Sequence, residues 1–213
     1  MPTVTINNKT TNKFSLAVTE TELREAKTAL QENGFNVVIV DGLEEAKKTV
    51  ERLIPEQSEV FTATSVTLKE SGLEQSLNNP DLYVSVRDKY MAHYGNPEKA
   101  VEMRRIGSAS DYAVGSVHAL TQEGHVVIAS ASGSQLPNYV YGASNVIWVV
   151  GAQKIVSDLD EAFDRIENHT LPLEDKRALA AYGVNSSINK VLIYRKEQNK
   201  RVTIVLVKEP VGF

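Results

Sequence analysis

The chain has 213 residues, of which 42% are hydrophobic and 23% charged, and its formal net charge is -4. These values are typical of a globular protein, and the acidic balance argues against a nucleic-acid surface. The absence of cysteine excludes disulfides, thiolate metal sites, cysteine-bound iron–sulfur clusters and a cysteine nucleophile within the chain.

The histidines and the apolar runs bear on a metal site, a membrane span and a secretory leader. The four histidines show neither HxH nor HExxH spacing, so we expect no metal site. No apolar run has the length of a membrane span, and the first residues lack the apolar core of a secretory leader. We therefore expect a cytoplasmic protein that binds no membrane, no nucleic acid and no cofactor of its own.

Helical and strand patterns alternate along the first part of the chain. Residues 1–18 are polar and predict an N-terminal arm, whereas residues 19–213 predict one α/β domain. The first elements expected in that domain are a helix from Thr19 to Gly34, a strand over 36–40, a helix over 43–53, a strand over 59–63 and a helix over 67–77. Thr19 and Glu22 have the spacing of a capping box. The alternation predicts a three-layer fold with a mostly parallel open sheet flanked by helices.

A stretch from Tyr112 to Gly151 forms the centre of the predicted sheet. Its three Val- and Ile-rich runs predict buried strands over 112–117, 125–129 and 145–150. A Gly/Ser loop and a short helical stretch separate the last two runs, which predicts a βαβ unit. The loop would then lie at the carboxyl end of a strand, where open α/β sheets bind ligands.

The C-terminal part predicts two helices and two strands. The helices are expected over 158–166 and 171–182, the first capped by Asp158. Strands over 188–194 and 202–207 are separated by a charged turn. We expect them to form a C-terminal antiparallel hairpin at a sheet edge.

Several polar side chains follow the predicted strands and could bind an anion. The candidates are Thr64, Ser65, Thr67, Ser116, His118, Ser132, Gly133, Ser134, Lys154 and Arg195. Hydroxyls and amides near a helix start favour anions, although helix capping alone also explains the Ser and Thr residues. His118 could donate a hydrogen bond, act as an acid or base, or be structural. Ordinary solvation is the simpler account of Lys154 and Arg195.

Several short motifs occur in the order found in a known family. They are Thr67-Leu68 with Gly72-Leu73, Ser110-Asp111-Tyr112, the run Ser116–Gly124, Val140-Tyr141-Gly142, Lys154-Ile155-Val156 with Asp158-Leu159, and the end Val205–Phe213. Together they resemble the LUD-domain family, the lactate-utilisation protein C group, over nearly the whole chain from about Thr19.

The resemblance implies both a fold and a metabolic role. The fold would be the sheet shared by ribose-5-phosphate isomerase, glucosamine-6-phosphate deaminase and CoA-transferases. The role would be in the oxidation of L-lactate to pyruvate beside iron–sulfur partner subunits. The sequence departs from the family at His118, where an asparagine is usual, and at Glu123, where an aspartate is usual. It also departs at Ala131–Gln135, which lacks an acid and a glycine, and over 183–195, which lacks the cysteines of many relatives.

The leading hypothesis is an accessory or small subunit of lactate-type hydroxy-acid utilisation. It would bind a small anion where Thr64–Leu68, Ser116–His118 and Ser132–Ser134 converge. One alternative is a stand-alone enzyme of the isomerase or CoA-transferase type, for which His118 and Glu123 are the central candidates. The other is a non-catalytic partner protein with a relic cleft. A deep pocket lined by the three segments would favour the first two hypotheses, and a filled cleft would favour the third.

Overall fold

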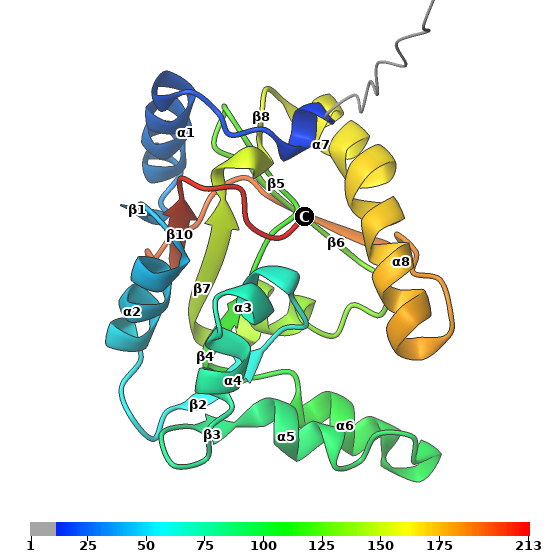
Figure 1. Ribbon diagram of the computed structural model, residues 1–213. Coiled ribbons are helices and arrows are strands. Elements are labelled where there is room, and N and C mark those ends of the chain that lie inside the picture. Colours follow the sequence, from blue (N-terminus) through cyan, green and yellow to red (C-terminus); the bar gives the residue numbers. More distant parts are fainter. Residues whose placement is uncertain (1–11) are drawn as a thin grey trace, which may run out of the picture.

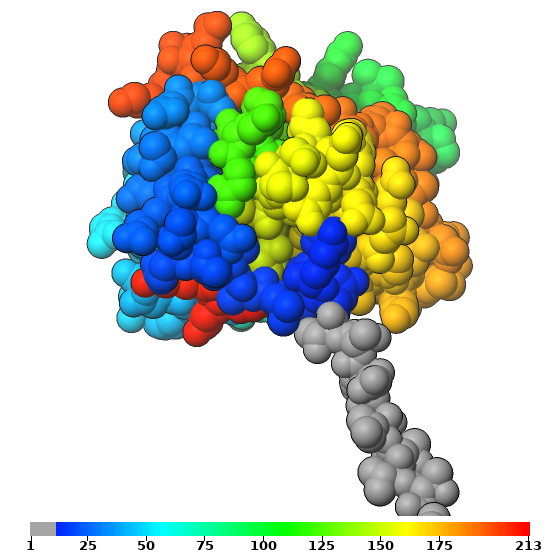
Figure 2. Space-filling model, turned by 90° about the horizontal axis from the view of Figure 1, so that it is seen from above, coloured from blue at the N-terminus to red at the C-terminus, as the bar shows by residue number. Residues whose placement is uncertain are grey.

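The computed structural model describes residues 12–213, so the predicted arm lies outside the described residues up to position 11. From Asn12 onward the chain packs on the molecule. Phe14 is buried, and Lys13 forms a salt bridge of 2.9 Å with Glu161 on helix α7 (Leu159–Arg165). Figure 2 shows this dark-blue segment lying against the yellow region that contains α7.

Six parallel strands form the main sheet, in the order β1-β10-β7-β4-β2-β3 (Figure 1). The strands are β1 (Asn36–Val40), β2 (Glu59–Thr62), β3 (Val84–Ser85), β4 (Ser110–Gly115), β7 (Ala143–Gly151) and β10 (Val202–Val207). Side chains of one strand alternate between the two faces, so Trp148 packs on one side while Ile147 and Val149 pack on the other. Both faces are covered, which explains the almost continuous apolar strands.

Helices and a second sheet cover the two faces of the main sheet. The helices are α1 (Glu20–Glu32), α2 (Leu43–Leu53), α3 (Val66–Glu70), α4 (Leu73–Leu77), α5 (Val86–Met91), α6 (Ala100–Ile106), α7 and α8 (Leu171–Tyr182). Helices α2, α3 and α4 share a core with one face, and α1 shares a core with the other. The predicted three-layer α/β fold is therefore confirmed. The capping box of Thr19 and Glu22 is also present at the start of α1.

The second sheet has four strands in the order β8-β5-β6-β9. They are β5 (Ala119–Thr121), β6 (Val126–Ser130), β8 (Ile155–Val156) and β9 (Lys190–Tyr194). Leu120, Val126 and Ile128 join the core on the face of the main sheet that α1 also covers. Val127, on the opposite face of the second sheet, packs with Ala162 of α7. This sheet thus forms a layer between α7 and the main sheet.

Three expectations are wrong, two about which strands pair and one about the length of a helix. The predicted βαβ unit does not exist, because β6 and β7 belong to different sheets and β6 pairs antiparallel with β5 and β9. The C-terminal hairpin does not exist either, since β9 pairs with β6 while β10 runs parallel between β1 and β7. The helix expected over 67–77 is divided into α3 and α4 at Gly72, whose φ of 72° is left-handed. Apolar patterns reveal burial but not the neighbouring strand, which explains the first two errors.

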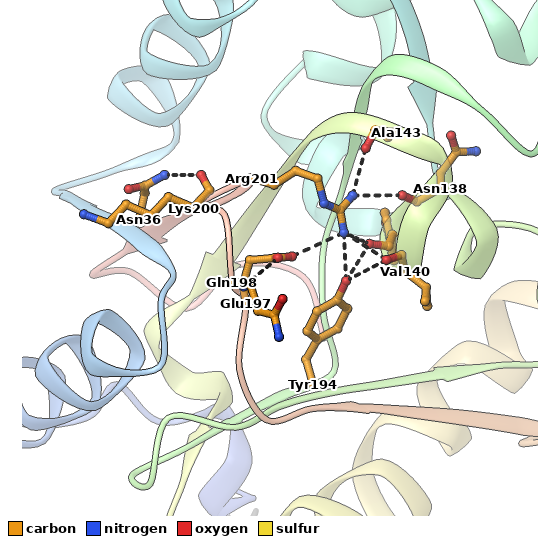
Figure 3. A network of polar contacts seen from close by, with 10 residues as sticks. Asn36, Asn138, Val140, Ala143, Tyr194, Glu197, Gln198, Lys200 and Arg201 are labelled. Carbon is orange, nitrogen blue, oxygen red and sulfur yellow. Dashed lines mark hydrogen bonds and ion pairs between the residues drawn. The ribbon is translucent and has the colours of Figure 1, made fainter.

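The segment that links β9 to β10 is anchored by a polar network (Figure 3). Arg201 donates hydrogen bonds to the carbonyls of Tyr139, Val140 and Ala143 at 2.6, 3.1 and 2.9 Å. These carbonyls lie at the end of the π-helical segment η3 (Asn138–Gly142), where backbone oxygens lack intrahelical donors. The Tyr194 hydroxyl also donates to Tyr139, at 2.8 Å. The network therefore joins the two sheets where the chain passes from one to the other.

Candidate functional site

A cavity of about 390 Å³ lies beyond the carboxyl ends of the strands of the main sheet. Its walls come from segments that are distant in sequence: residues 63–67 after β2, 116–118 after β4, 129–135 around the end of β6, Lys154 after β7, and 170–188 around α8. The three segments predicted to converge, Thr64–Leu68, Ser116–His118 and Ser132–Ser134, thus all contribute to one cavity.

Two hydroxyls, one in the first turn of α3 and one directly after β4, face each other. Thr67 is almost fully buried, and its Oγ1 lies 3.5 Å from Ser116 Oγ. The neighbouring Ser65 caps α3, because its hydroxyl accepts the amide hydrogen of Leu68 at 3.4 Å. Thr64 is exposed at the cavity rim. Ser65 therefore serves α3 itself, whereas Thr67 and Ser116 supply a hydroxyl pair beside the cavity.

The amine of Lys154 is the most unusual group in this wall. The residue is only 2% exposed and ends the short 3-10 helix η4 (Ala152–Lys154) after β7, so the expectation of a solvated lysine is wrong. Its Nζ donates to Ser116 Oγ at 3.2 Å and to the carbonyl of Val117 at 3.1 Å. Burial and the charge of Arg165 lower the pKa of Lys154 to about 7. The amine is therefore partly neutral near physiological pH.

Arg165 is the second buried cation, with 0% exposure. It lies at the end of α7, and its Nη1 donates to the carbonyl of His118 at 2.7 Å and to Thr170 Oγ1 at 2.9 Å. Its Nε and Nη2 have no hydrogen-bond partner among residues 12–213. Buried charges are normally paired, yet within the described chain every hydrogen bond made by Lys154 or Arg165 goes to an uncharged oxygen.

His118 lies near both cations, and its ring is held in one orientation. Its Nδ1 accepts the amide hydrogen of Ala129 at 3.2 Å, so in the neutral ring the hydrogen belongs on Nε2. Burial, together with the charges of Lys154 and Arg165, lowers the pKa of His118 to about 3. His118 is thus a neutral hydrogen-bond donor at physiological pH, and a general-base role is disfavoured.

The serines of the Gly/Ser loop bond mainly to one another. Ser132 Oγ donates to Ser134 Oγ at 3.2 Å, and Ser130 Oγ accepts the Gly133 amide hydrogen at 2.8 Å. Ser132 and Ser134 border the cavity, whereas Gly133, with a φ of 83°, provides the turn between them. The loop therefore presents hydroxyls at the rim, further from the buried cations than Ser116.

Two charged candidates from the sequence lie away from this cavity. Arg195 is exposed and lines a separate groove formed with Tyr141 and residues 192–201. Glu123, the acid considered for an enzyme, has a largely exposed side chain beside His125. Conversely, sequence reasoning missed Arg165, because its position at the end of a charged helix resembles that of any solvated arginine.

The C-terminal segment crosses the edge of the site and is fixed by side chains of two elements. Gln153 Nε2 donates to the carbonyl of Val211 at 2.9 Å, and the Gly212 amide donates to Glu70 Oε2 at 2.8 Å. Gly212 has a φ of 61°, and a Cβ there would overlap the hydroxyl of Thr67. This close approach requires glycine and keeps the segment against the hydroxyl pair.

A comparison with protein families fits this architecture. The family model of the LUD domain matches residues 23–207, which is most of the chain. The chain belongs to the LUD-domain family. The LUD domain is also similar in fold to a solved DUF162 family protein from Deinococcus radiodurans, with a TM-score of 0.54 and 10% identity over 88% of this chain and 96% of the other. No curated protein matches its sequence.

The helices and the metal-ligating side chains of the LUD domain limit the kinds of site it can hold. None of the helices in residues 12–213 has the length and apolar character needed to cross a bilayer. Across the same residues, no group of three or more His, Asp or Glu side chains is arranged to hold a metal ion. The cations that line the cavity are Lys154 and Arg177, the latter paired with Glu174 at 2.6 Å. Arg165 lies behind the wall, bonded to the lining residues His118 and Thr170.

Proposed function

We propose that this LUD-domain protein binds a small organic anion in the cavity and acts as an accessory component of lactate-type hydroxy-acid utilisation. The observation that carries the proposal is the pair of buried cations, Lys154 and Arg165, whose hydrogen bonds go only to uncharged oxygens within the described chain. The charge of Glu70 favours the charged form of Lys154, but this carboxylate is bonded to the Gly212 amide and not to either cation. Burying cations without a hydrogen-bonded counter-charge is costly, and a bound carboxylate or phosphate would offset that cost.

The surrounding groups suit an anion of modest size. Ser116 and Thr67 can donate hydroxyl hydrogens, and neutral His118 can donate from Nε2. The open volume of about 390 Å³ suits a small molecule and argues against a filled, relic cleft. The link to lactate-type acids, and to iron–sulfur partner subunits, rests on family membership alone.

Binding should take up protons. An anion favours the charged form of Lys154, whose pKa is lowered to about 7 in the free protein. The affinity should therefore be highest below that pH and should fall as the pH rises through it. Proton uptake makes the heat of binding depend on the ionisation enthalpy of the buffer, which gives a readout independent of affinity.

Calorimetry with L-lactate, pyruvate and small sugar phosphates would test the proposal. We expect saturable binding of one class, lost in Lys154→Met and retained in Lys176→Met, which removes an exposed lysine of α8. Absence of binding by every anion, or unchanged binding in Lys154→Met, would contradict it. Co-purification with iron–sulfur proteins would then be the measurement that examines a purely partner-binding role.

A further inference from the structure

The chemical state of the Lys154 amine suggests more than charge pairing. Nζ lies beside the cavity, within hydrogen-bond distance of Ser116 and the Val117 carbonyl, and the residue is almost fully buried. Arg165 donates to the carbonyl of His118, the residue after Val117, so two cations bond to adjacent peptide groups. A lysine that is desolvated and next to a second cation is kept partly unprotonated, which makes it a nucleophile.

The electrostatics agree with that geometry. Burial is the main cause of the lowered pKa of Lys154, and the charge of Arg165 is the second. Near neutral pH a large fraction of the amine therefore carries a free electron pair. When the amine is neutral, Arg165 still supplies positive charge behind the wall, where it bonds to the lining residues His118 and Thr170. Arg177 also lines the cavity, but it is paired with Glu174. One unpaired cation matches a monoanion such as a carboxylate better than a dianionic phosphate.

We propose that Lys154 forms an imine with the carbonyl carbon of a small 2-oxo acid bound in the cavity, a step that rests on the proposed anion-binding function. The amine nitrogen attacks the carbonyl carbon, and the carbonyl electron pair moves to oxygen. A proton passes from nitrogen to that oxygen to give a carbinolamine. Loss of water then leaves the C=N bond. One amine and one ketone give one imine and one water, with no oxidant or reductant.

Neighbouring residues are placed to assist each part of this step. The Ser116 hydroxyl, 3.2 Å from Nζ, can relay the proton between the nitrogen and the departing oxygen. Arg165 supplies the positive field that attracts the carboxylate of the acid. His118, neutral and donating from Nε2, can hold an oxygen without competing for the proton.

Borohydride trapping on the full chain would test the imine. The protein is incubated with pyruvate, reduced, and examined by intact mass and peptide mapping. We expect a mass increase equal to that of the acid less one oxygen atom, located on Lys154. L-lactate, which has no ketone group, should leave no adduct. Lys176→Met should be labelled like the wild type, whereas Lys154→Met and Lys154→Arg should lose the adduct.

Two further measurements keep the outcomes distinct. Calorimetry without reductant reports binding alone, so binding of pyruvate without trapping would overturn the imine and leave the anion site standing. A lack of both with pyruvate would overturn the imine, and a lack of binding by every anion tested would overturn the anion site as well. Ser116→Ala should fold, retain the amine and trap more slowly. Equal labelling in Lys154→Met, or trapping by dihydroxyacetone phosphate but not by pyruvate, would also overturn the assignment.

Discussion

Replacement of Lys154 by methionine should make the protein more stable at neutral pH while abolishing anion binding. Methionine has a similar length and fills the same volume without a charge. The buried amine destabilises the wild-type protein, because its pKa falls from 10.5, the ordinary value for lysine, to about 7 in the folded chain. This cost disappears in the variant.

The sign and size of this stability difference follow from proton linkage. Between pH 7 and 10.5 the unfolded chain binds the proton and the folded chain does not, so the stability of the wild type rises with pH across that window. Below pH 7 both the folded and the unfolded chain bind the proton, so the buried charge destabilises the folded protein by the full amount. At about 1.4 kcal/mol per pKa unit, this amount is about 5 kcal/mol. Between about pH 6 and about pH 9, wild-type stability should therefore rise by about 2 to 3 kcal/mol relative to Lys154→Met. Lost hydrogen bonds to Ser116 and Val117 subtract a constant amount that does not depend on pH.

Urea unfolding of both proteins across that pH range provides the assay, with the free energy of unfolding extrapolated to water. Lys176→Met, which removes an exposed lysine of α8, controls for the loss of a charge. The difference between the variant and the wild type should shrink steadily as the pH rises. Parallel pH profiles for the two proteins would show that Lys154 is not held in a desolvated state, and would refute the reasoning for the site as well.

Three further changes probe other parts of the structure. Arg165→Met should raise the pKa of Lys154, since the charge of Arg165 lowers it. The pH at which anion affinity falls should therefore move upward in calorimetric titrations, and an unchanged pH would contradict the electrostatic coupling of the two cations. Gly115→Ala should lower the free energy of unfolding by about 1 to 3 kcal/mol, because a Cβ there would overlap the Tyr139 hydroxyl. Denaturant titration measures this loss, and a variant as stable as the wild type would contradict the overlap. Arg201→Met should cost about 2 to 3 kcal/mol through loss of its hydrogen bonds to backbone carbonyls at the end of η3, and an unchanged melting temperature would count against the network in Figure 3.

The sequence by itself determined most of the individual elements and the family. Apolar runs of β1 and β10, the capping box at Thr19 and the helix over Leu171–Tyr182 are encoded by neighbouring residues, and the structure reproduces them. The hydroxyl-rich segments after β2 and β4 were also predicted to meet, because carboxyl ends of parallel strands share one edge. These features depend on local spacing and on a general rule of sheet topology.

Only the tertiary structure decided which strands are neighbours and which charges are buried. Strands β9 and β10 follow each other in sequence yet join different sheets, since pairing depends on the surfaces that each strand can bury. Lys154 and Arg165 resemble solvated cations along the chain, and each is buried because β7, α7 and the second sheet pack around them. Burial sets the local dielectric, and therefore the pKa values on which the proposed chemistry depends.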